Sequence, residues 1–250
     1  MNVLFIDSGI GGISTLQECV KLIPNLNFIY YADDKYSPYG NLSQKLITKR
    51  LENIIDDLLI TNNINIVVLA CNTATANSID FLRKKYMLPI VGIEPAINLI
   101  TSNHAAVIAT PSTIMQSRFK NLVNKSKYKI DVIPEPYLAK LIDNYFLYGD
   151  IFAFDEIENI VKELCSQNYS TIVLGCTHYL HIKKLFEKYN HIITTDGNYG
   201  LAKQLKRLIL EQNTSIKPTR KFMLSSKNKA LAKKYRKIFD ETLANNINVW

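Results

Sequence analysis

Short apolar runs rich in β-branched residues recur along this chain, and each is followed by a stretch whose apolar residues have helical spacing. Residues 44–60 illustrate the helical pattern, with apolar side chains on one side at Leu46, Ile47, Leu51, Ile54, Ile55, Leu58 and Leu59. Because strands that alternate with helices form a parallel sheet, we predict an α/β fold of doubly wound parallel sheets. The predicted strands are residues 3–6, 28–32, 64–70, 90–93, 105–110, 129–133, 171–175, 191–195 and 221–224.

Two kinds of strand-to-helix loop occur twice in the sequence, at almost the same separation. The loop around Asp7 corresponds to the one around Thr110, 103 residues later, and the loop around Cys71 corresponds to the one around Cys176, 105 residues later. Because two different loops recur at nearly the same separation, the sequence indicates an internal duplication. We therefore predict two similar domains, residues 1–94 and 95–204, that face each other across a cleft. Residues 205–250 exceed one repeat, and we expect this segment to return to the first domain.

The chain of 250 residues has no apolar run long enough to span a bilayer, so we expect no membrane association. Its opening, from Met1 to Asp7, lacks the basic region and the small-residue cleavage site of a secretory signal, which favours a cytoplasmic protein. The four cysteines are widely scattered and form no C-x-x-C pair. In a reducing compartment we expect free thiols, rather than a disulfide framework or a zinc site.

The formal net charge of +8 is concentrated near the end of the chain. Residues 201–250 hold 12 Lys and Arg against three acidic residues, while the rest of the chain is nearly neutral. A basic segment can bind nucleic acid, but the basic residues at 229–237 alternate with Leu231, Tyr235 and Ile238 at helical spacing. We therefore interpret them as the solvated face of a helix and expect no nucleic-acid partner.

Cys71 and Cys176 each end an apolar strand, just before a predicted helix. This position places a thiol near the positive end of the helix dipole, which favours the thiolate. The alternative is that each cysteine is a small apolar residue that fills a strand end. The repeated setting favours the functional interpretation for this pair. Cys19 and Cys165 lie inside helical patterns, and we expect them to be packing residues.

A pair of thiols suits the inversion of an α-carbon, because one proton must leave one face while another arrives at the opposite face. One group acts as a base and its partner as an acid, and the roles exchange in the reverse direction. The thiol pKa, near ~8.5 in model peptides, is tunable toward neutrality. The sequence therefore favours a racemase. A cysteine hydrolase using Cys176 and His178 is an alternative, although it leaves Cys71 idle.

Asp7 opens a glycine-rich loop that superficially resembles a dinucleotide-binding fingerprint. Ser14 fills the third glycine position, and the Asp7 carboxylate would repel a pyrophosphate at the helix start. A carboxylate there suits a substrate ammonium or the proton of a neighbouring thiol, and His178 could serve Cys176 in the same way. We treat His104, His181 and His191 as surface or packing residues.

Several of these segments, taken together, resemble the glutamate racemase family. The matching runs are residues 5–12, 30–33, 38–40, 70–74, 108–113 and 174–179, and Asp196-Gly197 is similar to a late loop of the family. They occur in order from residue 3 to about residue 197. Two segments depart from the family pattern: residues 34–37, and residues 136–143, which end in Asp143 where the family usually has Glu.

The resemblance implies a two-domain enzyme that interconverts L- and D-glutamate without pyridoxal phosphate, metal or any other cofactor, supplying D-glutamate for peptidoglycan. It implies that Cys71 takes the α-proton of D-glutamate and Cys176 that of L-glutamate, assisted by Asp7 and His178 respectively. We expect a homodimer, and keep an aspartate racemase of the same fold and a small-ligand binding protein as alternatives. The residues implied to hold the substrate are Ser8, Tyr39, Gly40, Asn72, Thr73, Thr110 and Thr177.

Overall fold

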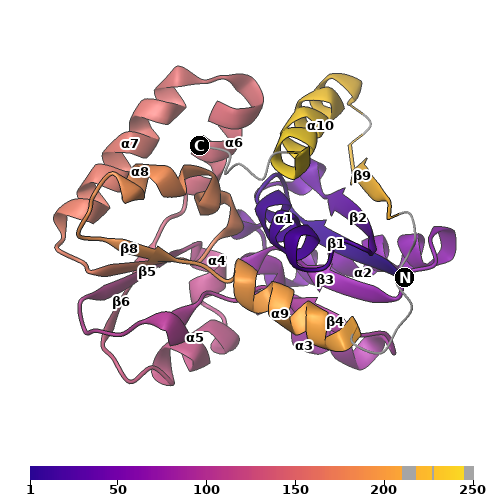
Figure 1. The fold of residues 1–250 in the computed structure, drawn as a ribbon, viewed down its shortest axis with the longest axis horizontal. Coiled ribbons are helices and arrows are strands. Elements are labelled where there is room, and N and C mark those ends of the chain that lie inside the picture. Colours follow the sequence, from indigo (N-terminus) through magenta and orange to yellow (C-terminus); the bar gives the residue numbers. More distant parts are fainter. Residues whose placement is uncertain (210–217, 227, 245–250) are drawn as a thin grey trace.

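The chain folds into two parallel sheets that lie side by side, each flanked by helices (Figure 1). The computed structural model describes residues 1–209, 218–226 and 228–244. Within these residues the first sheet has the strand order β4-β3-β1-β2-β9 and the second has the order β6-β5-β7-β8. The α/β class with two doubly wound parallel sheets is therefore confirmed.

The strands are β1 (Asn2–Asp7), β2 (Asn27–Ala32), β3 (Ile66–Leu69), β4 (Ile90–Gly92), β5 (Ala105–Ala109), β6 (Ile130–Pro134), β7 (Thr171–Leu174), β8 (Ile193–Thr195) and β9 (Arg220–Leu224). The α-helices are α1 (Gly12–Leu22), α2 (Gln44–Thr61), α3 (Asn72–Lys85), α4 (Pro111–Ile114), α5 (Ser117–Asn124), α6 (Leu138–Tyr148), α7 (Ile151–Ser166), α8 (Lys183–Glu187), α9 (Asn198–Ile209) and α10 (Lys229–Ala244). Short 3-10 helices are η1 (Asp34–Tyr36), η2 (Tyr39–Asn41), η3 (Ile97–Leu99) and η4 (Thr177–Ile182). Every predicted strand is present, with ends that differ by at most two residues.

The two sheets repeat one topology, as the internal duplication predicted. Strands β2-β1-β3-β4 of the first sheet have the same order as β6-β5-β7-β8 of the second. Ile6 pairs with Leu69 in the first sheet and Ile108 pairs with Leu174 in the second, and in each sheet a cysteine follows two residues after the leucine. This register aligns Asp7 with Ala109. The expected equivalence of Asp7 and Thr110 is therefore wrong by one residue.

Local sequence accounts for the helices that pack against these sheets. The side chain of Ser43 accepts a hydrogen bond from the Leu46 N–H and thereby caps α2. The face of α2 that includes Ile47, Leu51 and Leu58 is buried against the first sheet, as the spacing predicted, whereas Leu46, which was expected on the same side, is 38% exposed. This amphipathic pattern fixes which side of α2 faces the sheet and leaves Lys45, Lys49 and Asp57 exposed.

The end of the chain belongs structurally to the first sheet. Strand β9 pairs in parallel with β2, and α10 buries Tyr235, Ile238 and Phe239. The basic residues of α10 are exposed, which confirms that they form a solvated helix face. Helix α9 packs against α1. The domain limits at residues 94 and 204 stay a prediction, and residues 210–217, 227 and 245–250 of the returning segment lie outside the described residues.

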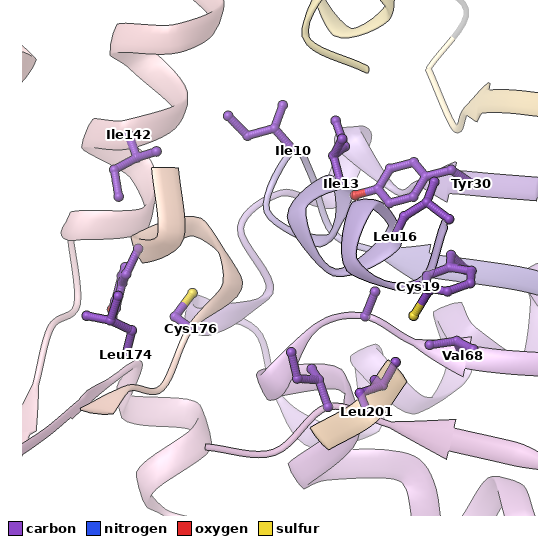
Figure 2. Close-up of a cluster of buried hydrophobic side chains, with 14 of the residues drawn as sticks. Ile10, Ile13, Leu16, Cys19, Tyr30, Val68, Ile142, Leu174, Cys176 and Leu201 are labelled. Atoms are coloured by element: carbon purple, nitrogen blue, oxygen red, sulfur yellow. The ribbon is translucent and has the colours of Figure 1, made fainter. Parts of the chain in front are cut away.

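None of the described helices is long and apolar enough to cross a membrane. One cluster of buried apolar side chains extends from the first half of the chain into the second, and it includes Tyr30 on one side and Ile142 and Leu174 on the other. Figure 2 shows Cys176 with Leu174 beside it, Ile142 on the neighbouring helix, and Ile10 toward the first half. The halves are therefore joined by a shared core as well as by the chain.

We expect Phe239→Ala to lower the free energy of unfolding by about 3–5 kcal/mol, because it empties a buried site between α10 and the first sheet. Phe239 is 1% exposed and its ring lies against those of Tyr30 and Phe222. Urea unfolding followed by circular dichroism measures the change. The matched control is Phe81→Ala on α3, where the ring is 49% exposed and the expected loss is about 0.5 kcal/mol or less. Equal losses in the two variants would contradict a structural role for α10.

Candidate active site

The carboxyl ends of β1, β3 and β7 meet where the two halves face each other, and each ends in a residue singled out by the sequence. Asp7 ends β1, while Cys71 and Cys176 follow β3 and β7 by two residues. Cys71 is 4% exposed, Cys176 is 5% exposed and Asp7 is fully buried. The negative charges of Asp7 and Cys176 act on the Cys71 thiol, so the three groups share one buried site.

Cys71 occupies the N-cap position of α3, and the backbone N–H groups of Thr73 and Ala74 point to its sulfur. Burial raises the pKa of the Cys71 thiol, the nearby charges of Asp7 and Cys176 raise it further, and the two N–H groups lower it. The net pKa lies above its ordinary value. The expectation that the helix start favours the thiolate is therefore wrong for Cys71, because burial raises the pKa of this thiol more than the helix N–H groups lower it.

Asp7 is held at both of its carboxylate oxygens. Oδ1 accepts a hydrogen bond of 2.7 Å from the Gly9 N–H, and Oδ2 accepts one of 3.3 Å from the hydroxyl of Thr177 in the second half. Burial raises the pKa of Asp7, and the charge of His178 opposes this shift without reversing it. Asp7 is thus a buried carboxyl group whose ionisation is coupled to the opposite half of the molecule.

The other thiol lies beside a histidine and a second buried carboxylate. Cys176 Sγ is 3.9 Å from His178 Nδ1, and His178 Nε2 is 3.3 Å from Asp143 Oδ1 on α6. Nε2 and Oδ1 are close but misaligned, since within the described residues neither atom has a hydrogen-bond partner of good geometry. Cys176 is followed by the short 3-10 helix η4 rather than by the α-helix that the sequence predicted.

Burial alone would lower the pKa of His178, but Asp143 and Cys176 together raise it well above its ordinary value. His178 is therefore favoured as an imidazolium beside Cys176. The sequence assigned no role to Asp143. A usable signal was present, because Asp143 falls on the face of α6 that also buries Leu138, Ala139 and Ile142, where an unpaired carboxylate is costly.

Three threonine hydroxyls join the halves on the other side of the site. Thr73 Oγ1 lies 2.9 Å from Thr110 Oγ1 and 3.1 Å from Thr113 Oγ1, and the latter two are 3.0 Å apart. All three residues are buried. The structure thus brings together the predicted Thr73 and Thr110 and adds Thr113, which received no role from the sequence although it lies in a matching run.

Glycines let the halves approach this closely. A Cβ atom on Gly11 would lie 2.6 Å from His178 Nδ1 and 2.6 Å from Thr177 Oγ1, and a Cβ atom on Gly40 would lie 2.9 Å from the Thr110 Cβ. All three distances are shorter than those that real Cβ atoms show. At Gly11 and Gly40, therefore, the loops of the first half approach the second half with backbone atoms.

Tyr39 and Gly40 are held in place by a buried ion pair. Arg50 on α2 donates hydrogen bonds of 3.0 and 2.7 Å to the two carboxylate oxygens of Asp33, and the Tyr39 hydroxyl donates one of 2.7 Å to Oδ2. Asp33 is fully buried and the Arg50 side chain is 19% exposed. The Arg50 guanidinium also lies over the Tyr36 ring at 4.2 Å. The loop from Asp33 to Gly40 is fixed by this network.

The remaining predicted residues have simpler settings. Ser8 and Asn72 are buried next to Asp7 and Cys71, respectively. His181 is a buried packing residue whose Nε2 lies 3.1 Å from the Ile10 carbonyl oxygen, and burial together with the charge of His178 lowers its pKa to about 4. Cys19 and Cys165 are buried in the core, as expected. Within the described residues, no group of three or more His, Cys, Asp or Glu is placed to hold a metal ion.

No family model matches the chain. Glutamate racemase from Clostridium botulinum (strain Okra / Type B1) is 37% identical over 223 residues, which cover 84% of this chain and 84% of that protein. This chain belongs to the glutamate racemase family. The predicted class of enzyme, an amino-acid racemase, is confirmed by this membership.

Solved structures of glutamate racemases have the same fold. The Escherichia coli enzyme, in complex with L-glutamate and the activator UDP-MurNAc-ala, matches with a TM-score of 0.84 at 23% identity, over 96% of this chain and 94% of that one. The Francisella tularensis enzyme, in complex with D-glutamate, matches with a TM-score of 0.78 at 25% identity, over 98% and 94% of the two chains. The family's fold therefore extends over nearly the whole chain.

We expect Arg50→Met to lower the free energy of unfolding by about 3 kcal/mol, because it leaves the buried Asp33 carboxylate without its cation. Urea unfolding measures this change. The control is Arg236→Met on α10, which breaks an ion pair of 2.8 Å with Asp240 whose side chains are 53% and 55% exposed. The control should lose about 0.5 kcal/mol or less. Similar losses in both variants would show that the Asp33 pair contributes no more than a surface pair.

Proposed function

We propose that the protein interconverts L- and D-glutamate by two-base proton transfer between the α-carbon and the thiols of Cys71 and Cys176. The observation that carries this proposal is the meeting of two cysteines, from equivalent strand ends of two similar halves, in one buried site. Membership of the glutamate racemase family supplies the substrate.

In one direction Cys71, as the thiolate, takes the α-proton of D-glutamate while Cys176 delivers a proton to the opposite face. In the other direction Cys176 takes the α-proton of L-glutamate and Cys71 delivers one. Each thiol must therefore exist in both forms during the cycle. The raised pKa of Cys71 suits its role as the acid. The substrate ammonium, a positive charge arriving next to buried anions, would lower that pKa and favour the thiolate.

The two thiols have different partners. Asp7 acts on the Cys71 side, where its carboxyl group can hold the proton that the thiol exchanges or face the substrate ammonium. His178, charged by its proximity to Asp143, acts on the Cys176 side. We propose that Ser8, Tyr39, Gly40, Asn72, Thr73, Thr110 and Thr177 hold the charged groups of the substrate through side chains and backbone N–H groups. Because both cysteines are buried, the strand ends must separate to admit glutamate.

The wider biological role follows from the family. We propose that the enzyme needs no cofactor, acts in the cytoplasm as a homodimer, and supplies D-glutamate for peptidoglycan. The related enzymes from Escherichia coli and Francisella tularensis were crystallised with L-glutamate and D-glutamate, respectively. Aspartate racemisation is the nearest alternative activity, and an assay with both amino acids separates the two.

A cysteine hydrolase is the other candidate. Cys176, His178 and Asp143 follow one another as the nucleophile, base and orienting carboxylate of a hydrolase would. A hydrolase of this kind would need neither Cys71 nor Asp7, yet both are buried at the same site and electrostatically coupled to it. The racemase uses all five groups, so we favour it.

We expect Cys71→Ala and Cys176→Ala each to lower kcat/KM for glutamate racemisation by about 10²–10⁴-fold or more, because each removes one of two required proton-transfer groups. The assay incubates pure protein with L-glutamate, without added cofactor, and follows optical rotation. Cys165→Ala is the matched control, since this buried thiol lies in the core away from the strand ends.

The outcomes separate the candidates. Loss of activity in both variants, with unchanged circular dichroism and with the control close to wild type, supports the two-base assignment. Full activity in Cys71→Ala would instead favour a one-cysteine mechanism centred on Cys176 and His178. A wild-type protein that acts on L-aspartate and not on L-glutamate would overturn the choice of substrate.

A further inference from the structure

We propose that Ser37 is a positioning residue for the Cys176 side of the reaction, which it serves by fixing the carboxylate of Asp143 against His178. The inference rests on the proposed function for its catalytic consequence. Ser37 lies between η1 and η2 in the first half, and its hydroxyl donates a hydrogen bond of 3.0 Å to Asp143 Oδ2 on α6.

The geometry of Asp143 explains why an anchor is needed. A carboxylate on one rotatable bond turns freely unless one of its oxygens is held. With Oδ2 bound to Ser37, Oδ1 is left facing His178 Nε2 at 3.3 Å. That approach is misaligned for a hydrogen bond, so the His178 ring does not hold the carboxylate by itself. Ser37 is thus the hydrogen-bond donor that sets the orientation of Asp143.

Ser37 and His178 rest against the same stretch of backbone. A Cβ atom on Gly9 would lie 2.9 Å from Ser37 Oγ and 3.0 Å from His178 Nε2. The serine, the histidine and the Gly9 backbone therefore form one close-packed group that spans the two halves. Because Ser37 belongs to the first half and Asp143 to the second, their hydrogen bond joins the two halves next to His178.

The titratable side chains that face His178 are Asp7 at the end of β1, Asp143 on α6, Cys176 after β7 and His181 on η4. Asp143 and Cys176 raise the pKa of His178, whereas burial lowers it. A carboxylate that turns away from His178 gives less of this stabilisation. Loss of the Ser37 hydroxyl should therefore lower the pKa of His178 without removing any group that touches the thiol.

The experiment compares wild type, Ser37→Ala, Asp143→Asn and the double variant in kcat/KM for L-glutamate and in the NMR titration of ¹⁵N-labelled histidine. We expect Ser37→Ala to lower kcat/KM about tenfold and to move the His178 titration, with the corresponding limb of the pH-rate profile, to lower pH. In the Asp143→Asn background the serine change should add less than about twofold, because Ser37 acts through Asp143.

Ser102→Ala is the control, since it removes another half-buried serine hydroxyl, 2.7 Å from Ser170 Oγ, at the far end of β5. It should leave kcat/KM and the His178 titration unchanged. The proposal would be overturned if Ser37→Ala left kcat/KM and the His178 titration unchanged, as the control should. It would also be overturned if Ser37→Ala lowered kcat/KM by a full tenfold in the Asp143→Asn background. If the wild-type protein were inactive on glutamate, only the proposed function would be overturned. The His178 titration would still show whether Ser37 positions Asp143.

Discussion

The approach of two strand ends from two different sheets is the constraint on which the rest of this structure depends. A two-base inversion needs its acid and its base on opposite sides of one carbon, and a single sheet edge cannot place two side chains in that way. Duplicated halves solve the problem, because Cys71 and Cys176 follow equivalent strands of the two sheets and lie close enough to interact electrostatically. Glycines at positions 11 and 40 permit the contact, and threonine hydroxyls from both halves close it.

Burial gives the site its electrostatic character. Asp7, Asp143 and His178 are almost fully buried beside the two thiols, so each charge depends on the others. Burial keeps the Cys71 thiol and the Asp7 carboxyl group nearer to their protonated forms, while Asp143 keeps His178 charged. A substrate with one ammonium and two carboxylate groups enters a site that already holds charges of both signs. In the proposed reaction, the positive charge of the substrate ammonium would oppose the raised pKa of Cys71.

The sequence predicts the features of this structure that depend on residues close together in the chain. Periodicity located the strands, and the loops after β3 and β7 located both cysteines, because strand ends in a parallel sheet are defined by neighbouring residues. Contacts between distant segments were missed: Asp143 with His178, Arg50 with Asp33, and Ser37 with Asp143. Each depends on how the two halves or adjacent elements pack, which a run of residues does not encode. The prediction that Cys71 is a thiolate was wrong for the same reason. The burial that raises the pKa of this thiol arises only when the two halves pack together.

The most direct test of the two-base account is the fate of the α-proton in heavy water. With L-glutamate as substrate, the D-glutamate formed should carry deuterium at the α-carbon from the first turnover, because the acid that completes the inversion has exchanged with solvent. The remaining L-glutamate should stay protiated at early times, since the thiol that removed its proton does not return solvent deuterium until the product has formed and reversed. Mass spectrometry of the separated enantiomers measures both. Early deuterium in the unreacted L-glutamate would indicate a single base open to solvent and would contradict the account.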